Sequence, residues 1–363
     1  TRAARVDRDR PPRVTYWTGT WDPRKEAISK EISHLRVADR RRALVVAFSS
    51  RQPVRFRRRE RVFTFGHRHW PVLRSLAPLL ERAGDVTHVF GGAESWHLLR
   101  SIGRRPIVLT AVVHAKPGET LPHLRFARVV VETDALIEEW TMRGVPRTAL
   151  TVVHPGIDLE RYAFAPLQRT DRLRFLFASS PSEPSEIDAR GIPLLIELAR
   201  ARPDIEIVVP WRPWGDVAGT TAVLDALRPP PNFHVYREHD ADMRRHFAHA
   251  HATIVCFQAG AGKALPNFVL EGLAVGRPCL ATRDNGLASL LQTSGAGIVR
   301  DRSVAGLSAA VDELRTSLDE RAVRARQLAE HRFDLRTFRA AYESIYRDVS
   351  CAFPAESPWT HRP

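Results

Sequence analysis

Residues Gly260–Gly286, GAGKALPNFVLEGLAVGRPCLATRDNG, carry the clearest indication of the fold of this chain. They follow the short apolar run His251–Phe257 (HATIVCF), which is typical of a buried strand. Pro266 lies where a helix would begin, since a missing N–H costs nothing at the first helical position, and Gly276 suits the left-handed end of that helix. Arg277–Thr282 is the next strand. The stretch therefore predicts a parallel βαβ unit whose helix N-terminus suits a phosphate.

The rest of the chain repeats this alternation of strand and helix in two halves. In the first half we predict strands at Arg13–Trp17, Ala43–Phe48, Val86–Phe90, Pro106–Val113, Ala127–Glu132 and Leu150–Val153. In the second half we predict further strands at Leu173–Ala178, Ile205–Pro210, Asn232–Tyr236 and Gly297–Val299. Three helices over Val304–Leu318, Glu320–Phe333 and Leu335–Val349 close the chain. The pattern predicts an α/β fold of two Rossmann-like, doubly wound domains, with ligands bound in the cleft between them.

A linker separates the two halves. Ala163–Asp171 contains a proline and lacks apolar periodicity. We therefore expect four parts: a flexible N-terminal arm over residues 1–12, a first domain over 13–165, a second domain over 166–333, and a C-terminal segment over 334–363.

The charge of the chain bears on its partners. It carries a net charge of +14, and nearly all of its basic residues are arginines. Such a charge favours phosphate-bearing or acidic partners and anionic surfaces, while an arginine-rich solvated surface is the simpler alternative. Residues 52–70 alternate arginine with apolar residues, which one or two half-exposed edge strands explain more simply than a nucleic-acid interface. We therefore expect no nucleic-acid partner, and peripheral contact with a membrane stays open.

Cysteine usage and hydropathy indicate the compartment. The three cysteines, Cys256, Cys279 and Cys351, form no CxxC pair and no even disulfide framework, and two of them lie in apolar runs. No apolar run approaches the ~20 residues of a membrane-spanning helix. Residues 1–13 are charged and lack a following apolar segment of the kind that signal peptides carry. We therefore expect a cytoplasmic protein with buried free thiols and no integral membrane segment.

Three motifs in order suggest a family. They are HPGIDLERY at 154–162, ARGIPLLIELAR at 189–200, and ALPNFVLEGLAVGRPCLATRDNG at 264–286. Together they resemble the nucleotide-sugar-dependent glycosyltransferases of family 4, which have the GT-B fold of two Rossmann-like domains. The resemblance covers most of residues 13–345. It implies that domain 166–333 binds the donor sugar nucleotide, that domain 13–165 binds the acceptor, and that a helix in 334–363 crosses back to the first domain.

The resemblance also implies the chemistry. We expect retaining sugar transfer, because no paired general acid and base stand out and the leaving phosphate itself can accept the acceptor's proton. UDP or GDP is the expected nucleotide of the co-substrate, and we expect neither a cofactor nor a metal. Tryptophans near the expected cleft, Trp17, Trp21 and Trp96, suggest a small-molecule acceptor in natural-product biosynthesis.

Glu271 and Lys263 are the two most informative donor-site candidates. In the family, the glutamate matched by Glu271 hydrogen-bonds the donor ribose, and Asn267 lies on the same helix face. A solvent-facing helix glutamate is the alternative. Lys263 stands where relatives carry a second glutamate that meets the donor sugar. We expect Lys263 to contact the donor's diphosphate or an altered sugar, while an inward salt bridge and a solvated loop lysine are the alternatives.

The diphosphate needs positive charge or N–H donors as the leaving group forms. Relatives use an arginine and a lysine for this, and Arg190 matches the lysine position, whereas the arginine position falls near Ser179. The amides of Asn267 and Phe268 would add helix-dipole stabilisation. Gly19, after the first strand, matches a glycine loop of the family that approaches the phosphates.

His114 and an acidic pair complete the candidates. His114 ends the strand at 106–113 and matches a histidine that relatives place beside donor sugar and acceptor, so we take it with Arg190 as a catalytic candidate. A structural histidine is the alternative. Asp240-Ala241-Asp242 resembles a metal-binding DxD motif, but N-capping of the following helix explains it more simply.

Two alternatives to a glycosyltransferase stay open. One is a GT-B enzyme of other chemistry, such as a nucleotide-sugar epimerase. The other is a donor-binding protein that has lost catalysis, which the lysine at 263 would suit.

Overall fold

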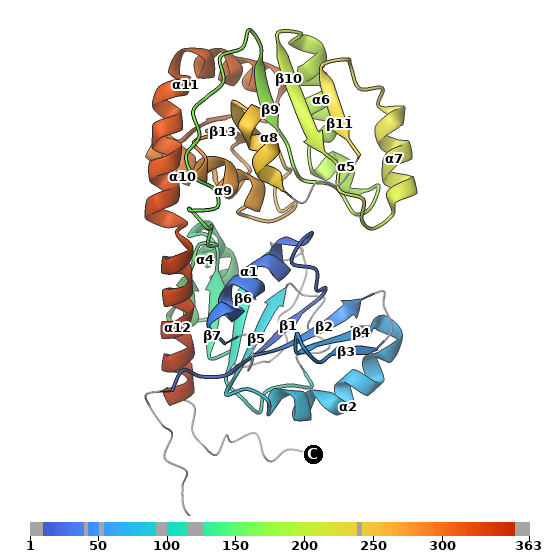
Figure 1. Cartoon of the computed structure of the whole chain (residues 1–363), viewed down its shortest axis with the longest axis vertical. Helices are drawn as coiled ribbons and strands as arrows, with labels where there is room; N and C mark the ends of the chain where they lie inside the picture. The colour runs from blue at the N-terminus through green and yellow to red at the C-terminus, as the bar shows by residue number, and fades with distance from the viewer. Residues whose placement is uncertain are drawn as a thin grey trace, which may run out of the picture. The chain divides into compact units, whose positions relative to one another are not determined.

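The computed structural model describes residues 10–39, 43–50, 54–91, 100–112, 114, 126–237 and 242–352. The chain divides into two compact units (Figure 1). Unit 1 comprises the residues up to Val153 together with those from Phe338 onward, and unit 2 comprises His154–Thr337. The ranges expected from the sequence instead divide at 165/166 and 333/334.

Unit 1 is built on a sheet in the order β3-β4-β2-β1-β5-β6-β7-β8. Its strands are β1 (Val14–Thr18), β2 (Leu44–Ser50), β3 (Arg55–Arg57), β4 (Val62–Gly66), β5 (Val86–Gly91), β6 (Ile107–Ala111), β7 (Arg128–Val131) and β8 (Leu150–Val152). All neighbours pair in parallel except β3, which runs antiparallel to β4. β1, β5 and β6 are buried along their whole length, as expected of central parallel strands. The arginine-rich stretch 52–70 thus supplies the edge strand β3, while β4 lies inside the sheet.

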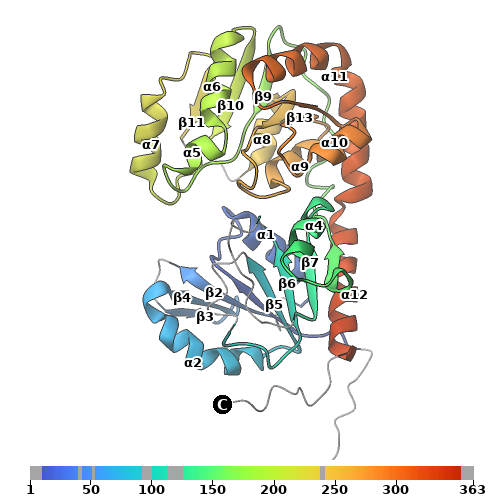
Figure 2. The ribbon, with the colours of Figure 1, turned by 180° about the vertical axis from the view of Figure 1, so that it is seen from behind.

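Within its described residues, unit 1 has the α-helices α1 (Ala27–Leu35), α2 (Trp70–Glu81), α4 (Ala135–Met142) and most of α12 (Leu335–Ala352). A buried polar chain ties α12 to the sheet. The Tyr346 hydroxyl lies 2.7 Å from His88 Nδ1, and the His88 Nε2 lies 2.7 Å from the Thr110 hydroxyl. Thr110 in turn lies 2.7 Å from the Tyr342 hydroxyl. These bonds satisfy buried polar groups that would otherwise destabilise the interior, so they fix α12 to β5 and β6 (Figure 2).

Unit 2 has a fully parallel sheet in the order β11-β10-β9-β12-β13-β14. The strands are β9 (Leu173–Leu176), β10 (Ile205–Pro210), β11 (Phe233–Tyr236), β12 (Ala252–Val255), β13 (Cys279–Thr282) and β14 (Gly297–Arg300). The helices are α5 (Glu186–Ala189), α6 (Ile192–Ala201), α7 (Val217–Ala226), α8 (Met243–His249), α9 (Asn267–Ala274), α10 (Ala288–Ser294) and α11 (Val304–Arg332). The predicted βαβ unit at 251–282 is confirmed as β12, α9 and β13.

One helix differs from its prediction. α11 is a single helix of 29 residues, whereas the sequence predicted separate helices over Val304–Leu318 and Glu320–Phe333. That prediction is wrong because no glycine or proline interrupts the junction and the buried apolar spacing continues across it, through Leu314, Leu318, Ala322 and Ala325. Within the described part of the chain, no helix is long and apolar enough to cross a bilayer.

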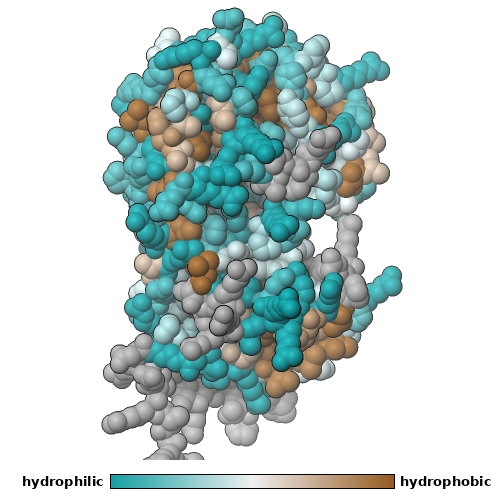
Figure 3. Space-filling model, viewed as in Figure 1, coloured by the Kyte–Doolittle hydropathy of each residue, from teal (hydrophilic) through white to brown (hydrophobic). Residues whose placement is uncertain are grey.

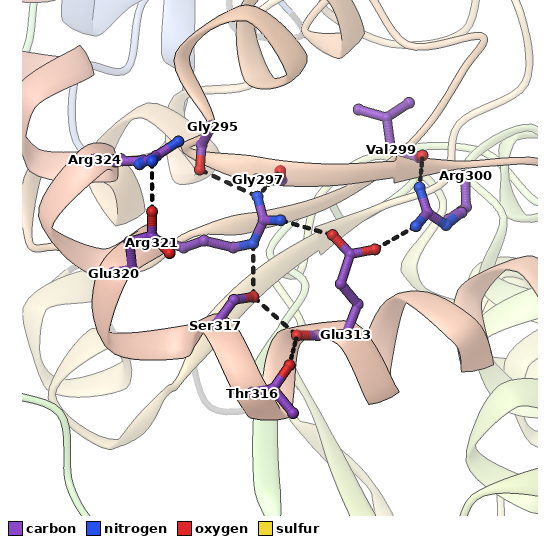
Figure 4. A network of polar contacts seen from close by, with 10 residues as sticks. All are labelled: Gly295, Gly297, Val299, Arg300, Glu313, Thr316, Ser317, Glu320, Arg321 and Arg324. Carbon is purple, nitrogen blue, oxygen red and sulfur yellow. Dashed lines mark hydrogen bonds and ion pairs between the residues drawn. The ribbon is translucent and has the colours of Figure 1, made fainter.

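A charged network fastens α11 to the sheet of unit 2 (Figure 4). Arg321 of α11 donates to the carbonyl oxygens of Gly295, at 3.2 Å, and Gly297, at 2.7 Å. Gly295 follows the last residue of α10, and Gly297 is the first residue of β14. Glu313 accepts from Arg321 at 2.6 Å and also pairs with Arg300 of β14. The Arg321 guanidinium therefore satisfies two main-chain carbonyls, one at the end of α10 and one at the start of β14.

Candidate active site

The candidate donor site lies at the carboxyl ends of β9 and β12. β9 pairs with β10 on one side and with β12 on the other, and β12 continues to β13. The order of the sheet therefore reverses between β9 and β12. In doubly wound sheets, ligands bind outside the carboxyl ends of the strands at such a switch point.

The loops that follow β9 and β12 contact each other directly. The Gln258 N–H donates to the Ala189 carbonyl at 2.8 Å, and the Gln258 amide donates to the Asp188 carboxylate at 2.8 Å. Gly191 has a left-handed φ of 76°, and a Cβ at this position would lie 2.3 Å from the Cys256 carbonyl oxygen. Only glycine fits so close a backbone approach. The structure thus brings Arg190 beside the glycine loop that precedes α9.

Arg190 is held in one orientation by its own loop. Its guanidinium donates to the Ser179 hydroxyl at 2.5 Å and pairs with the Glu186 carboxylate at 3.0 Å. Glu186 also accepts the Ser182 N–H at 2.7 Å. The Arg190 side chain is only 14% exposed, so these contacts pre-organise it. A guanidinium carries five N–H donors, and further donors remain for a phosphate after these bonds are made.

Lys263 lies at the start of α9. Its ammonium donates to the Asn267 side-chain oxygen at 3.0 Å. Pro266, which precedes the helix, makes no side-chain capping bond, as the missing N–H and apolar ring require. Pro266 therefore offers no side-chain oxygen to the amides of Asn267 and Phe268, and Lys263 lies beside this first turn of the helix. A bonded Lys263 next to helix N–H groups forms a positive site that suits an anion.

Glu271 is buried inside unit 2. It is 3% exposed, so the alternative of a solvent-facing helix glutamate is wrong. The Tyr162 hydroxyl hydrogen-bonds its carboxylate, and burial together with this carboxylate raises the pKa of Tyr162. Tyr162 closes the HPGIDLERY motif, so the structure joins two of the three motifs at this carboxylate. A carboxylate offers about four lone-pair sites and can accept further hydroxyl donors.

His114 and Gly19 belong to unit 1. Gly19 directly follows β1, and His114 follows β6, so both lie at carboxyl ends of the same sheet with β5 between their strands. His114 Nδ1 lies 2.8 Å from the Glu139 carboxylate of α4. The two side chains are 23% and 22% exposed. Glu139 therefore fixes the orientation of the imidazole and directs Nε2 away from itself.

The sequence did not point to Glu139. Two glutamates, Glu138 and Glu139, follow each other on α4, and nothing in the local pattern separates them. No sequence signal was available, because the pairing of β6 with β7, which starts α4 beside the end of β6, is known only from the structure.

A stacked pair after β10 was also missed. The Arg212 guanidinium lies 4.1 Å from the centre of the Trp214 ring. The Trp214 indole donates to the Ser180 carbonyl at 2.9 Å, and the Arg212 N–H donates to the Ser180 hydroxyl at 2.7 Å. Gly215 has a φ of 65°, and a Cβ there would lie 2.0 Å from the Ser182 carbonyl oxygen. The loops after β9 and β10 are thus fastened together, and they present a flat cation–aromatic pair.

The structure describes two of the three tryptophans that the sequence placed near the acceptor. Trp17 is fully buried, so it cannot contact an acceptor at the surface. Trp21 lies under the Arg36 guanidinium at 5.4 Å. Trp96 falls outside the described residues.

Among the described residues, no cluster of histidine, cysteine and carboxylate side chains could hold a metal ion. Asp240 lies outside the described residues. Asp242 caps α8, where its carboxylate accepts from the Arg244 N–H at 3.2 Å. The Arg244 guanidinium lowers the pKa of Asp242 to about 2. Capping therefore accounts for Asp242, as expected from the sequence.

No family model matches this sequence, and no curated protein matches it either. Solved structures do match its fold. HepE of Anabaena in complex with UDP-glucose superposes with a TM-score of 0.72 at 14% identity, over 94% of this chain and 100% of that chain. Sucrose-phosphate synthase of Thermosynechococcus elongatus gives 0.70 at 12% identity, over 94% and 100%. A glycosyltransferase of Rickettsia africae gives 0.67 at 11%, over 93% and 98%. These likenesses confirm the GT-B fold expected from the sequence.

Proposed function

We propose that this chain is a retaining glycosyltransferase that moves a sugar from a nucleoside diphosphate-sugar, with UDP or GDP as nucleotide, to a small-molecule acceptor. One observation carries the proposal. At the switch point of unit 2, the joined loops after β9 and β12 set Arg190 beside the segment that carries Lys263 and the start of α9, with Glu271 buried one turn further along that helix.

In this proposal the diphosphate is bound by positive groups of unit 2. Arg190 and Lys263 supply the charge, and the amides of Asn267 and Phe268 supply N–H donors at the positive end of a helix dipole. As the bond between sugar and phosphate breaks, negative charge grows on the leaving diphosphate. Donors that are already in place stabilise that charge without rearranging, which lowers the barrier.

The nucleoside would use the remaining features of unit 2. Glu271 would accept the ribose hydroxyls, because a buried carboxylate prefers hydrogen-bond donors. The base would stack beside Arg212 and Trp214; Ser180 accepts the Trp214 indole N–H and the main-chain N–H of Arg212. HepE, whose fold is similar, binds UDP-glucose, which supports a nucleotide-sugar ligand here.

The acceptor would bind unit 1, near His114 and Gly19. His114, oriented by Glu139, would hydrogen-bond the donor sugar or the acceptor hydroxyl and place it for attack. We propose that the reaction needs neither a cofactor nor a metal. We also place it in the cytoplasm and in natural-product biosynthesis; the buried thiols of Cys256 and Cys279 support a reducing compartment.

Incubation of the full chain with UDP- and GDP-sugars, with and without a panel of acceptors, tests this function, with mass spectrometry to detect transfer and proton NMR to assign the configuration of the sugar. Transfer to an acceptor with retention of the anomeric configuration is the expected result. Donor epimerisation without acceptor would identify the other GT-B chemistry, and tight donor binding without any turnover would identify a binding protein. The matched variants are Arg190→Gln, expected to lose turnover, and Arg169→Gln, whose 78% exposed side chain pairs with Asp319 and should leave turnover unchanged.

A further inference from the structure

α2 of unit 1 exposes a row of apolar side chains. Leu73, Ala77 and Leu80 face the interior and are buried. Val72, Leu76 and Leu79 are 49%, 37% and 62% exposed. Their spacing of four and three residues places them in one line along the helix. The apolar arc of α2 is therefore wider than the surface that the interior covers, whereas an ordinary surface helix carries polar residues there.

The edge of the sheet adds to this row. Phe56 on the edge strand β3 is 44% exposed, and Val54, just before it, is 43% exposed. Phe56 stacks on Phe63 of β4 with ring centres 4.1 Å apart, so its ring is held at the surface. Figures 1 and 2 place β3 and α2 at the same end of unit 1, and in Figure 3 hydrophobic atoms gather there.

The same segment is strongly basic. Between Val54 and Arg82 the sequence has eight arginines and two glutamates. The two glutamates leave most of this charge uncompensated. Glu81 is fully buried and accepts the N–H groups of Gly103 and Arg104, and Glu60 pairs with Arg57. The exposed arginines are Arg55, Arg58, Arg59, Arg68, Arg74 and Arg82.

We infer that α2 and the β3–β4 hairpin form a docking face for an anionic membrane surface. Guanidinium groups attract the phosphates of anionic lipids, and their long stems allow the apolar row to reach the boundary between headgroups and acyl chains. A partner bound by charge alone would not require exposed apolar side chains, which here are Val72, Leu76, Leu79 and Phe56. A partner bound by apolar contact alone would not require the arginines. A lipid surface uses both.

Other occupants fit this face less well. A two-fold contact with a second copy would set the basic face against itself, because such an interface uses the same patch on both copies. A stable protein interface takes roughly 20–30 residues a side, whereas the exposed apolar part of this face is one helix row and one strand end. Nucleic acid would use the arginines but not the apolar row. The inference is independent of the proposed donor site, which lies in unit 2.

Vesicle co-sedimentation of the full chain tests the inference, with phosphatidylcholine vesicles that contain or lack phosphatidylglycerol. The chain should sediment with the anionic vesicles only, and rising salt should release it. The double variant Leu76→Ser, Leu79→Ser should lower partitioning about tenfold, because exposed apolar area no longer inserts. Arg58→Gln, Arg59→Gln should also lower it. Val323→Ser, at a 51% exposed valine of α11, is the matched control and should bind as the parent does.

Several outcomes would overturn the inference. These are absence of sedimentation with anionic vesicles, equal sedimentation with neutral vesicles, and full binding by the double leucine variant. A dimer in sedimentation velocity that the leucine variant abolishes would instead assign the face to a second copy. Because the replaced leucines are exposed, thermal melting should show the variant folded, and binding to UDP or GDP reports separately on unit 2.

Discussion

His114 Nδ1 lies 2.8 Å from the carboxylate of Glu139, which joins a histidine at the end of β6 to the helix that follows the neighbouring strand. A carboxylate bonded to one ring nitrogen fixes the imidazole plane and its tautomer. The other nitrogen is then held in one direction, ready for a hydroxyl. This pair gives His114 a defined geometry that a loosely held surface histidine would lack.

Removal of this carboxylate should therefore act on turnover. Glu139→Gln should lower kcat about tenfold with little change in the KM for the donor, because His114 would no longer be held for the reaction. Glu138→Gln, at the exposed neighbour, should leave both constants unchanged. The double variant with His114→Ala should be no slower than His114→Ala alone. Equal kcat values for Glu139→Gln and the parent would show that the pair is only structural.

Gly191 should resist substitution more than a left-handed glycine whose side-chain position is open. In Gly191→Ala the new Cβ would meet the Cys256 carbonyl oxygen at 2.3 Å, at a φ of 76°. We expect a loss of about 2 kcal/mol or more in the free energy of unfolding, together with weaker nucleotide binding, because the loops after β9 and β12 must separate. Urea denaturation measures the loss.

The control for this substitution is Gly144→Ala. Gly144 has a φ of 89°, but nothing lies within 4 Å of its would-be Cβ. It should lose only the ~1 kcal/mol of backbone strain and keep nucleotide binding. Similar losses at the two positions would contradict the close approach.

Two buried histidines should make the protein less stable in acid. Burial lowers the pKa of His88 well below its ordinary 6.5 and lowers that of His251 as well. The folded state keeps both neutral, whereas the unfolded chain binds protons below 6.5. Stability is therefore complete above this pH and falls below it, by up to about 1.4 kcal/mol per pH unit for each histidine.

Urea midpoints about one unit above and one unit below this pH measure the effect. His251→Asn provides the comparison, because its side-chain oxygen can still accept the Arg174 N–H that His251 Nδ1 accepts at 2.9 Å. Asparagine does not titrate, so the pH dependence should shrink. An unchanged pH dependence of the urea midpoint in His251→Asn would show that His251 does not contribute to the loss of stability in acid.

Lys263 should determine how unit 2 binds the donor. Its ammonium lies at the first turn of α9, 3.0 Å from the Asn267 side chain. Lys263→Glu would put a negative charge beside a bound diphosphate or an anionic sugar, so donor affinity should fall about tenfold or the choice of donor should change. Lys263→Gln separates loss of charge from repulsion. Donor affinity and choice that stay the same in Lys263→Glu would place the lysine outside the donor site.

The sequence was sufficient for the βα rhythm and for the centre of unit 2. Pro266 and Gly276 mark the two ends of α9 because each restricts the backbone locally. The edge strand β3 could be predicted for a similar reason, since alternation of period two is a local property of a strand, whereas β4 lies inside the sheet. α11 shows the limit of local patterns, because separate helices were predicted on the two sides of Asp319 while the buried face of the observed helix continues across it.

Contacts between distant segments could not be predicted. Glu139 meets His114 across 25 residues, and Tyr162 meets Glu271 across more than a hundred, so no spacing in the sequence connects them. The Arg212–Trp214 stack depends on Ser180, in the loop of another strand. Such contacts follow from the order of strands in a sheet, which places loops side by side only once the fold is known.

Calorimetric titration of the full chain with UDP, GDP and dTDP, in the parent and in Glu271→Gln, measures whether unit 2 binds a nucleotide through Glu271. Unit 2 should bind UDP or GDP, and Glu271→Gln should weaken that binding about tenfold, because a neutral amide is a poorer acceptor for the ribose hydroxyls. Absence of binding by all three nucleotides, or equal affinity in the parent and in Glu271→Gln, would contradict a nucleotide-sugar site at α9.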